Sequence, residues 1–265
     1  MKRFPSLCVV VAGVWVSACG GSSPTTPTAA AAPAIAPATS VLLIDQTQGY
    51  SLANGTPDAV VTWTSSNSSV LAIDDAGNAT AIATGFATST ASFGNGQTAA
   101  LLVLVIPNYQ GTWTGNATNT ACTDLAGFAS INYCSQGLRT TRPLTLSITQ
   151  TGLTIVGTMT KSEAGGQVSG TVAGVIGSGG DITLAGTLTG LSSGANLVVT
   201  LLSWNSLATG PNMTGIGAAN VTSQQILGIA TVQWSFTGVT LTTASLSPGA
   251  GLRTVTSSSN QRKSQ

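Results

Sequence analysis

The chain has 265 residues, of which 6% are charged and none is histidine, and its formal net charge is +1. An average soluble domain carries about 25% charged residues, so this composition excludes long charged helices and favours β-sheet faced with Thr and Ser. Phosphate neutralisation needs clustered Lys and Arg, which are lacking here, so nucleic acid is excluded as a partner.

The N-terminal segment predicts export. Lys2 and Arg3 precede an apolar run over residues 4–16, which is the layout of a signal peptide and is shorter than the about 20 residues that span a bilayer. Residues 16–19 read Val-Ser-Ala-Cys and resemble the lipobox of bacterial lipoproteins. The resemblance implies a lipoprotein signal peptide over 1–18 and acylation of Cys19, with palmitate among the expected acyl chains. The alternative is an ordinary signal peptide with an incidental cysteine.

By the same resemblance, Gly20 after the cysteine implies sorting to the outer membrane. We therefore expect an exported protein that meets the membrane through an N-terminal acyl anchor, at the outer membrane or the cell surface. Residues 19–40 are rich in Pro, Ala and Thr and carry no charge. Such a segment favours extended conformations, so we expect a tether.

Short apolar runs separated by turn signals begin at residue 41 and predict strands. Four segments carry a familiar pattern: 61–67 (VTWTSSN), 70–73 (VLAI), 75–77 (DAG) and 81–85 (AIATG). They resemble the group 2 bacterial immunoglobulin-like domains. The resemblance implies an immunoglobulin-like β-sandwich over 41–107, with Trp63 as the buried anchor between two sheets.

Residues 108–245 predict about eight strands. The expected strands are 112–114, 143–149, 153–159, 167–173, 181–188, 196–204, 213–219 and 229–241. Most alternate Thr with Val, Leu or Ile, and the connections are short, which favours an antiparallel meander closed into a β-barrel. A β-sandwich gives the same alternation and remains the alternative fold for this block. Internal glycines at 157, 170, 186 and 238 indicate bulges or sharp curls.

The segment 109–113 (YQGTW) is similar to the Gly-x-Trp opening of lipocalin-type barrels, although the arginine that packs on that Trp has no clear counterpart. The resemblance implies that Trp113 plugs one end of the barrel. The last residues, 246–265, are polar and predict a disordered tail.

Cys122 and Cys134 lie in a polar insertion between the first two strands of the second block. In an exported protein a disulfide is the default expectation. A redox-active pair is the alternative, although the spacing is not Cys-x-x-Cys and no basic neighbour directly activates either thiol. We expect no metal and no cofactor, because two Cys without His do not supply four ligands of the usual kind.

The residue inventory argues against an enzyme, because without His there is no Ser-His-Asp or Cys-His arrangement. Asp124, Glu163 and Asp181 are interpreted as solvated surface acids rather than a glycosidase pair, and Asp74 and Asp75 as a turn rather than a Ca²⁺ site. Arg139 and Arg142 form a close cationic pair. We expect them to neutralise Asp124, with anion binding as the alternative.

Two functions follow from this organisation. The favoured hypothesis is a membrane-anchored, non-enzymatic surface protein in adhesion, interaction or structure, whose immunoglobulin-like spacer presents the second β-domain to an unknown partner. The other is a lipocalin-like carrier of a small apolar ligand. In that case Trp113, Trp204 and Trp234 line a cavity, whereas side chains that fill the barrel argue against it.

Overall fold

The computed structural model describes residues 31–54, 60–94 and 96–243. The signal peptide, Cys19, most of the tether and the tail lie outside these residues. Strands dominate the described part of the chain, and α1 (Gly127–Ser130) and α2 (Tyr133–Gly137) are short. The all-β fold class is therefore confirmed. No helix within the described ranges has the length and apolar character needed to cross a bilayer.

Residues 33–106 form a sandwich of short strands. Its strands are β1 (Ala34–Ala36), β2 (Val41–Leu43), β3 (Thr47–Gly49), β4 (Ser51–Ala53), β5 (Val61–Ser65), β6 (Leu71–Ile73), β7 (Asn78–Ala81), β8 (Gly85–Phe93) and β9 (Thr98–Ile106). One sheet has the order β2-β9-β8-β5, the other has the order β3-β7-β6, and β1 pairs with β4. β2 runs parallel to β9, and the other pairs are antiparallel.

Trp63 is buried among residues of both sheets, as expected of an anchor. A side chain at Gly77 would meet the Trp63 ring at 2.9 Å and the Tyr50 carbonyl at 2.6 Å, and its φ is +84°. Only glycine fits such a position. The turn between β6 and β7 therefore requires Gly77, because the turn packs directly on the Trp63 ring. β1 differs from expectation: it lies within the stretch predicted as tether, and Ile35 is buried in this core.

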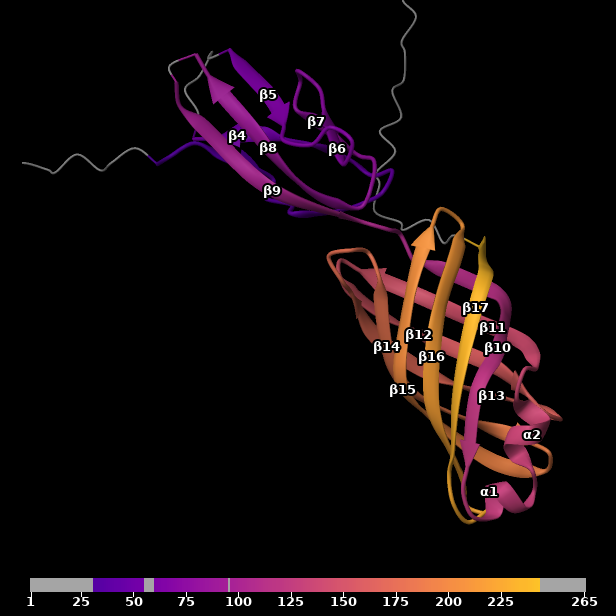
Figure 1. Ribbon diagram of the computed structural model, residues 1–265. Helices are drawn as coiled ribbons and strands as arrows, with labels where there is room; N and C mark the ends of the chain where they lie inside the picture. Colours follow the sequence, from indigo (N-terminus) through magenta and orange to yellow (C-terminus); the bar gives the residue numbers. More distant parts are fainter. Residues whose placement is uncertain (1–30, 55–59, 95, 244–265) are drawn as a thin grey trace, which may run out of the picture. The chain divides into compact units, whose positions relative to one another are not determined.

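Residues 111–243 form a closed antiparallel barrel in which each strand pairs with the next and the last pairs with the first (Figure 1). Its strands are β10 (Gly111–Asp124), β11 (Thr141–Thr151), β12 (Thr154–Glu163), β13 (Gly166–Ile176), β14 (Ile182–Ser192), β15 (Ala195–Thr209), β16 (Asn212–Ser223) and β17 (Ala230–Thr243). The barrel is confirmed, and the sandwich alternative for this block is excluded. Both helices lie at one end of the barrel (Figure 1), called the helical end below.

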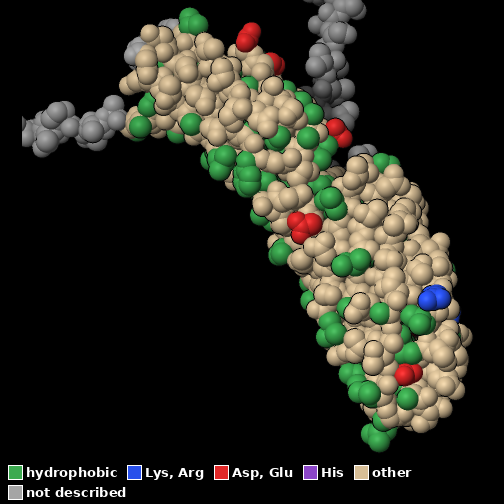
Figure 2. Space-filling model, viewed as in Figure 1, with side chains coloured by type: hydrophobic (Ala, Val, Ile, Leu, Met, Phe, Trp, Pro, Cys, Tyr) green, Lys and Arg blue, Asp and Glu red, His purple; other side chains and the backbone are tan. Residues whose placement is uncertain are grey.

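The barrel interior is packed with large side chains. They include Leu146, Ile155, Met159, Ile182 and Leu188, each nearly or fully buried. Outward positions carry mostly Thr, Ser, Ala and Asn, and Figure 2 shows hydrophobic side chains scattered singly over the visible face with few charges between them. The interior is thus a core rather than a cup that runs the length of the barrel.

Inward-facing glycines let three neighbouring strands coil tightly. Gly170 of β13 pairs with Met159 on one side and Leu188 on the other. A Cβ at Gly170 would lie 2.1 Å from the Thr187 carbonyl oxygen, a separation no side chain tolerates. The curl expected from the internal glycines is therefore present in β12, β13 and β14, where Gly157, Gly170 and Gly186 lie opposite Ile148, Met159 and Val172. Gly238 of β17 is exposed instead, with a φ of +65°.

The segment between the first two barrel strands differs from expectation. β10 continues to Asp124, so Cys122 lies in the strand itself, and Cys134 lies in α2. The predicted strand ended at residue 114 because residues 115–124 lack apolar alternation. β17 supplies the missing partner, pairing with this part of β10 from Ala117↔Phe236 to Asp124↔Ala230.

Candidate functional site

The end of the barrel opposite the helices is closed by Tyr109 and Trp113, both fully buried. The Trp113 indole Nε1–H donates to the Tyr109 carbonyl oxygen at 2.7 Å. The Tyr109 hydroxyl donates to the Gly180 carbonyl at 2.6 Å and accepts from the Ala208 N–H at 2.9 Å. Burial raises the pKa of Tyr109 to about 12. Because these polar groups are all satisfied, we call this the sealed end.

The other tryptophans also lie in the interior. Trp204 stacks on Phe236 with ring centroids 4.6 Å apart, and its Nε1–H donates to Ser206 Oγ at 2.9 Å. Trp234 is 2% exposed and packs over Gly217. Trp113, Trp204 and Trp234 are thus parts of the packed interior, and none of the three lines the cavity at the helical end.

A cavity of about 320 Å³ lies at the helical end. Its walls come from β10, β11, α2, the β12–β13 and β14–β15 turns, and the loop before β17. Apolar side chains in the walls include Ile131, Leu197, Ile226 and Val232, and polar ones include Asn119, Tyr133, Arg142 and Glu163. An apolar pocket with a few convergent polar groups is the usual form of a small-molecule site.

Two charged side chains pair at this end. Lys161 Nζ and Glu163 Oε1 form an ion pair of 2.7 Å, and their side chains are 3% and 10% exposed. Lys161 Nζ also lies 5.5 Å from the centroid of the Trp234 ring, within the range of a cation–π contact. Buried charges are costly unless paired, and this pair meets that requirement.

Arg142 has no such partner. It follows the inward alternation of Leu144 and Leu146 on β11 and lines the cavity. Its Nε is buried without a hydrogen bond, and within the described ranges the guanidinium forms no ion pair. The Asn119 side chain is anchored because Nδ2 donates to the Gly137 carbonyl at 3.1 Å, while its buried Oδ1 has no partner. A donor and an acceptor are therefore left unused at the same cavity.

Tyr133 lies close enough to Glu163 and Arg142 for both charges to affect its hydroxyl. Burial raises the pKa of its hydroxyl well above the usual range, the Glu163 carboxylate raises it further, and the Arg142 guanidinium lowers it. The ring packs edge-on against Phe128 with centroids 5.3 Å apart. The Tyr133 hydroxyl is therefore a neutral donor at the cavity wall at neutral pH.

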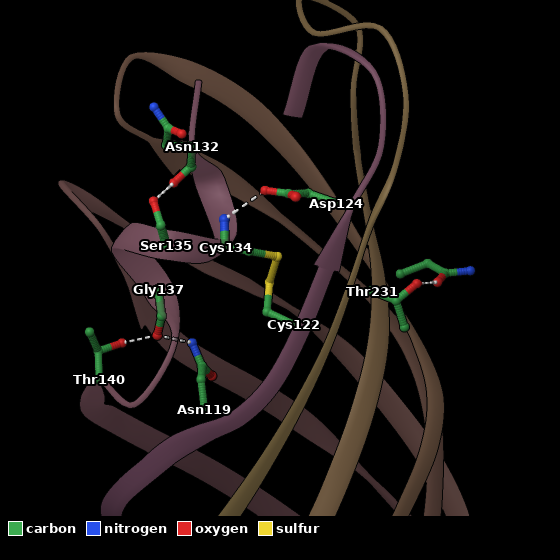
Figure 3. The surroundings of a disulfide bond; sticks show 10 residues. Asn119, Cys122, Asp124, Asn132, Cys134, Ser135, Gly137, Thr140 and Thr231 are labelled. Carbon is green, nitrogen blue, oxygen red and sulfur yellow. Dashed lines mark hydrogen bonds between the residues drawn. A yellow bond between two sulfur atoms is a disulfide. The ribbon is translucent and has the colours of Figure 1, made fainter. Parts of the chain in front are cut away.

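A disulfide holds α2 against the barrel (Figure 3). Cys122 of β10 is bonded to Cys134 of α2, with Cα atoms 5.3 Å apart. Beside it the Asp124 carboxylate accepts the Cys134 backbone N–H at 2.9 Å. The predicted disulfide is confirmed, and because Cys122 lines the cavity, the bond also fixes one cavity wall.

The structure revises two expectations about charge. Glu163 is not a solvated surface acid but half of a buried ion pair. Asp124 is not neutralised by the arginines: it accepts the Cys134 N–H, and Lys161–Glu163 is the ion pair found within the described residues. Arg142 instead faces the cavity, because its position on β11 alternates inward.

Asp181 and Asp74 do not line the cavity. Asp181 accepts a hydrogen bond from Asn205 Nδ2 at 3.3 Å, near the sealed end. Asp74 accepts the N–H groups of Ala76 and Asn78, and the side-chain hydrogen bond from Asn78 is the main reason that its pKa is lowered. Asp74 thus organises the turn between β6 and β7, as predicted.

Sequence reasoning missed Lys161, Asn119 and Tyr133. The signal for Lys161 is parity: Ile155, Met159, Lys161 and Glu163 lie on one face of β12, so a strand with an apolar inward face carries two charges on that face. Tyr133 and Asn119 have no comparable signal. Their positions depend on α2 and on the irregular pairing of β10 with β17.

Comparison of the chain with protein-family models and with curated proteins finds no match.

Proposed function

We propose that this chain is an exported, lipid-anchored, non-enzymatic protein whose barrel binds a small molecule in the cavity at its helical end. The observation that supports it is a cavity with unused buried polar atoms in a barrel that is otherwise filled. Cys19 is the membrane anchor, at the outer membrane or the cell surface, and the immunoglobulin-like sandwich is the spacer. This combines the display hypothesis with a narrower form of the carrier hypothesis.

Binding is favoured over catalysis because the carboxylates near the cavity already have partners. The chain has no His, and the Glu163 carboxylate is already paired with Lys161. Asp124 is held by the Cys134 N–H. A general base must be free to take a proton from a substrate, and neither carboxylate at the helical end is placed for that.

The cavity volume sets the size of the ligand. An engineered apolar cavity of about 150 Å³ holds benzene, and the cavity here is about 320 Å³. The site therefore suits a compound of one or two rings, or a short chain. A long acyl chain has no room, because Leu146, Met159 and Leu188 fill the barrel below.

The binding test compares two neighbouring residues. Ile226 lines the cavity, whereas Leu227 is 85% exposed. We expect calorimetric titration of the full chain with phenol, indole, 1-naphthol and indole-3-acetate to detect binding of at least one compound. Ile226→Trp should abolish that binding by filling the cavity, and Leu227→Trp should leave it unchanged. Equal loss in both variants, or no binding of any compound, contradicts the proposal.

The anchor is tested separately through the two cysteines of the N-terminal segment. We expect the wild-type chain to incorporate labelled palmitate and to fractionate with membranes. Cys19→Ser should abolish both, and Cys8→Ser should change neither. Labelling that survives in Cys19→Ser contradicts the lipoprotein assignment.

A second candidate, adhesion through the rim of the helical end, is favoured by a group of exposed apolar side chains. Leu125 and Leu227 are 59% and 85% exposed. Their segments lie side by side, because the Leu125 N–H donates to the Ile229 carbonyl and the Gly127 N–H to the Leu227 carbonyl. We expect cells that display Leu125→Ser/Leu227→Ser to adhere less to hexadecane than wild type. Val156→Ser/Val175→Ser, elsewhere on the barrel, is the control and should behave as wild type.

A further inference from the structure

Among the charged side chains Lys161, Glu163 and Arg142, only Arg142 is left without an ion-pair partner in the described chain. Lys161 and Glu163 neutralise each other at 2.7 Å. Arg142 remains, with a buried Nε that donates to nothing in the described chain. A buried donor without an acceptor is costly, and more so when it belongs to a cation. The Arg142 side chain is half-buried, and an anion bound in the cavity would supply the acceptor that its Nε lacks.

The geometry of Arg142 favours a carboxylate. A guanidinium presents several N–H donors in a planar fork, which matches the two oxygens of a carboxylate. Tyr133 adds a hydroxyl that burial and Glu163 keep protonated. Within the described residues this hydroxyl makes no hydrogen bond, so it is available as a second donor.

Asn119 specifies a different group on the same ligand. Its Nδ2 is committed to the Gly137 carbonyl, which leaves Oδ1 as an acceptor in a site where it has no partner. An amide oxygen accepts only from N–H or O–H donors. The body of the ligand thus carries a donor as well as apolar surface for Leu197, Ile226 and Val232.

We infer that the cavity binds a small organic carboxylate whose acid group pairs with Arg142 and whose ring or short chain carries a hydrogen-bond donor for Asn119. This assignment rests on the proposed function, since it names the ligand class of the same cavity. It explains why one end of a hydrophobic barrel keeps a cation that nothing else in the described chain neutralises.

The test uses three compounds with one ring system and different charge. Indole-3-acetate is the anion, indole-3-acetamide the neutral analogue and tryptamine the cation. We expect calorimetric titration of the full chain to show indole-3-acetate binding about tenfold or more tighter than the amide, because an ionic hydrogen bond replaces a neutral one. Tryptamine should bind most weakly.

Arg142→Met separates the charge from the cavity. It should weaken indole-3-acetate about tenfold or more and leave indole-3-acetamide within about twofold. The unfolding midpoint should not fall, because the wild-type guanidinium has no partner to lose. Arg139→Met, at an exposed arginine nearby, should change neither affinity.

Asn119→Leu tests the proposed hydrogen bond from the indole N–H of the ligand to Asn119 Oδ1. It should weaken indole-3-acetate and leave 1-naphthylacetate, which has no ring donor, unchanged. Comparable binding of acid and amide, tightest binding of tryptamine, or an unchanged affinity in Arg142→Met overturns the carboxylate assignment. The proposed function survives those outcomes if Ile226→Trp still blocks neutral compounds, and it fails if nothing binds or if Ile226→Trp and Leu227→Trp lose binding equally.

Discussion

The two ends of the barrel are built from the same eight strands but differ in whether their buried polar groups are hydrogen-bonded. At the sealed end, the Tyr109 hydroxyl and the Trp113 indole donate to carbonyls at 2.6 and 2.7 Å. At the helical end, Arg142 Nε and Asn119 Oδ1 are buried without partners. Satisfied polar groups contribute to stability, whereas unsatisfied ones cost stability. Trp234 Nε1 is also buried without a partner, but Trp234 does not line the cavity. Under the proposed function, this contrast separates a structural end from a ligand-binding end.

The strongest test of the sealed end removes its largest side chain. Trp113 is fully buried, so Trp113→Ala should lower the free energy of unfolding by about 3–5 kcal/mol through lost burial and a new cavity. Ile131→Ala, at the helical end and 43% exposed, should cost less than about 1 kcal/mol. Urea denaturation measures both changes in the free energy of unfolding, and similar values would contradict the difference between the two ends.

The disulfide should affect the helical end selectively. Cys122 and Cys134 are separated by 12 residues, and a loop of this size is stabilised by about 3 kcal/mol when it is closed. Cys122→Ser/Cys134→Ser should lower the free energy of unfolding by about that amount. Hydrogen exchange should accelerate at the Asn119 and Leu138 amides. The Trp113 amide is the internal control, and faster exchange there would show that the two ends are coupled.

The two tyrosines form a matched pair across the ends. Tyr109→Phe leaves the Gly180 carbonyl and the Ala208 N–H without their shared partner, so it should cost about 1–3 kcal/mol of unfolding free energy. Tyr133→Phe removes a hydroxyl that has no hydrogen bond in the described chain, and its cost should be near zero. The reverse order, measured by urea denaturation, would assign the structural role to Tyr133.

Alkaline titration sharpens the same comparison without a mutation. Burial raises the pKa of all three tyrosines, that of Tyr109 to about 12. Between about pH 10 and 12 the Tyr109 hydroxyl ionises in the unfolded chain but stays neutral in the folded chain. The free energy of unfolding is therefore intact below about pH 10 and falls as the pH rises toward about 12. Absorbance at about 295 nm and about pH 10.5 should be lower in the native protein than after unfolding in urea. An equal absorbance before and after unfolding would contradict burial of Tyr109 and Tyr133.

Much of the fold was predictable because alternation is a local property. The Thr and Val alternation of β11 to β14 located these strands, and short turns between them imply neighbours in the sheet. The helices were not predictable. α1 and α2 have four and five residues, too few for an apolar period, and both lie beside a disulfide whose partner is in β10.

The candidate site was predictable only in part. Arg142 and Glu163 were recognised as residues with chemistry, but their environment was misjudged because exposure was inferred from charge. The parity of each strand assigns both of them to the inward face. No sequence pattern places Asn119, because β10 shifts register against β17 between Asn119 and Ala121.

The seam between β10 and β17 has a consequence for how the barrel is made. Trp113 pairs with Leu241, more than a hundred residues later in the chain. Contacts of such high sequence separation slow folding, since a long loop must close before they form. Until β17 arrives, β10 and β16 are open edges that can pair with other chains. The barrel therefore closes only after its last strand is available, so copies of the chain must be kept apart until synthesis is complete.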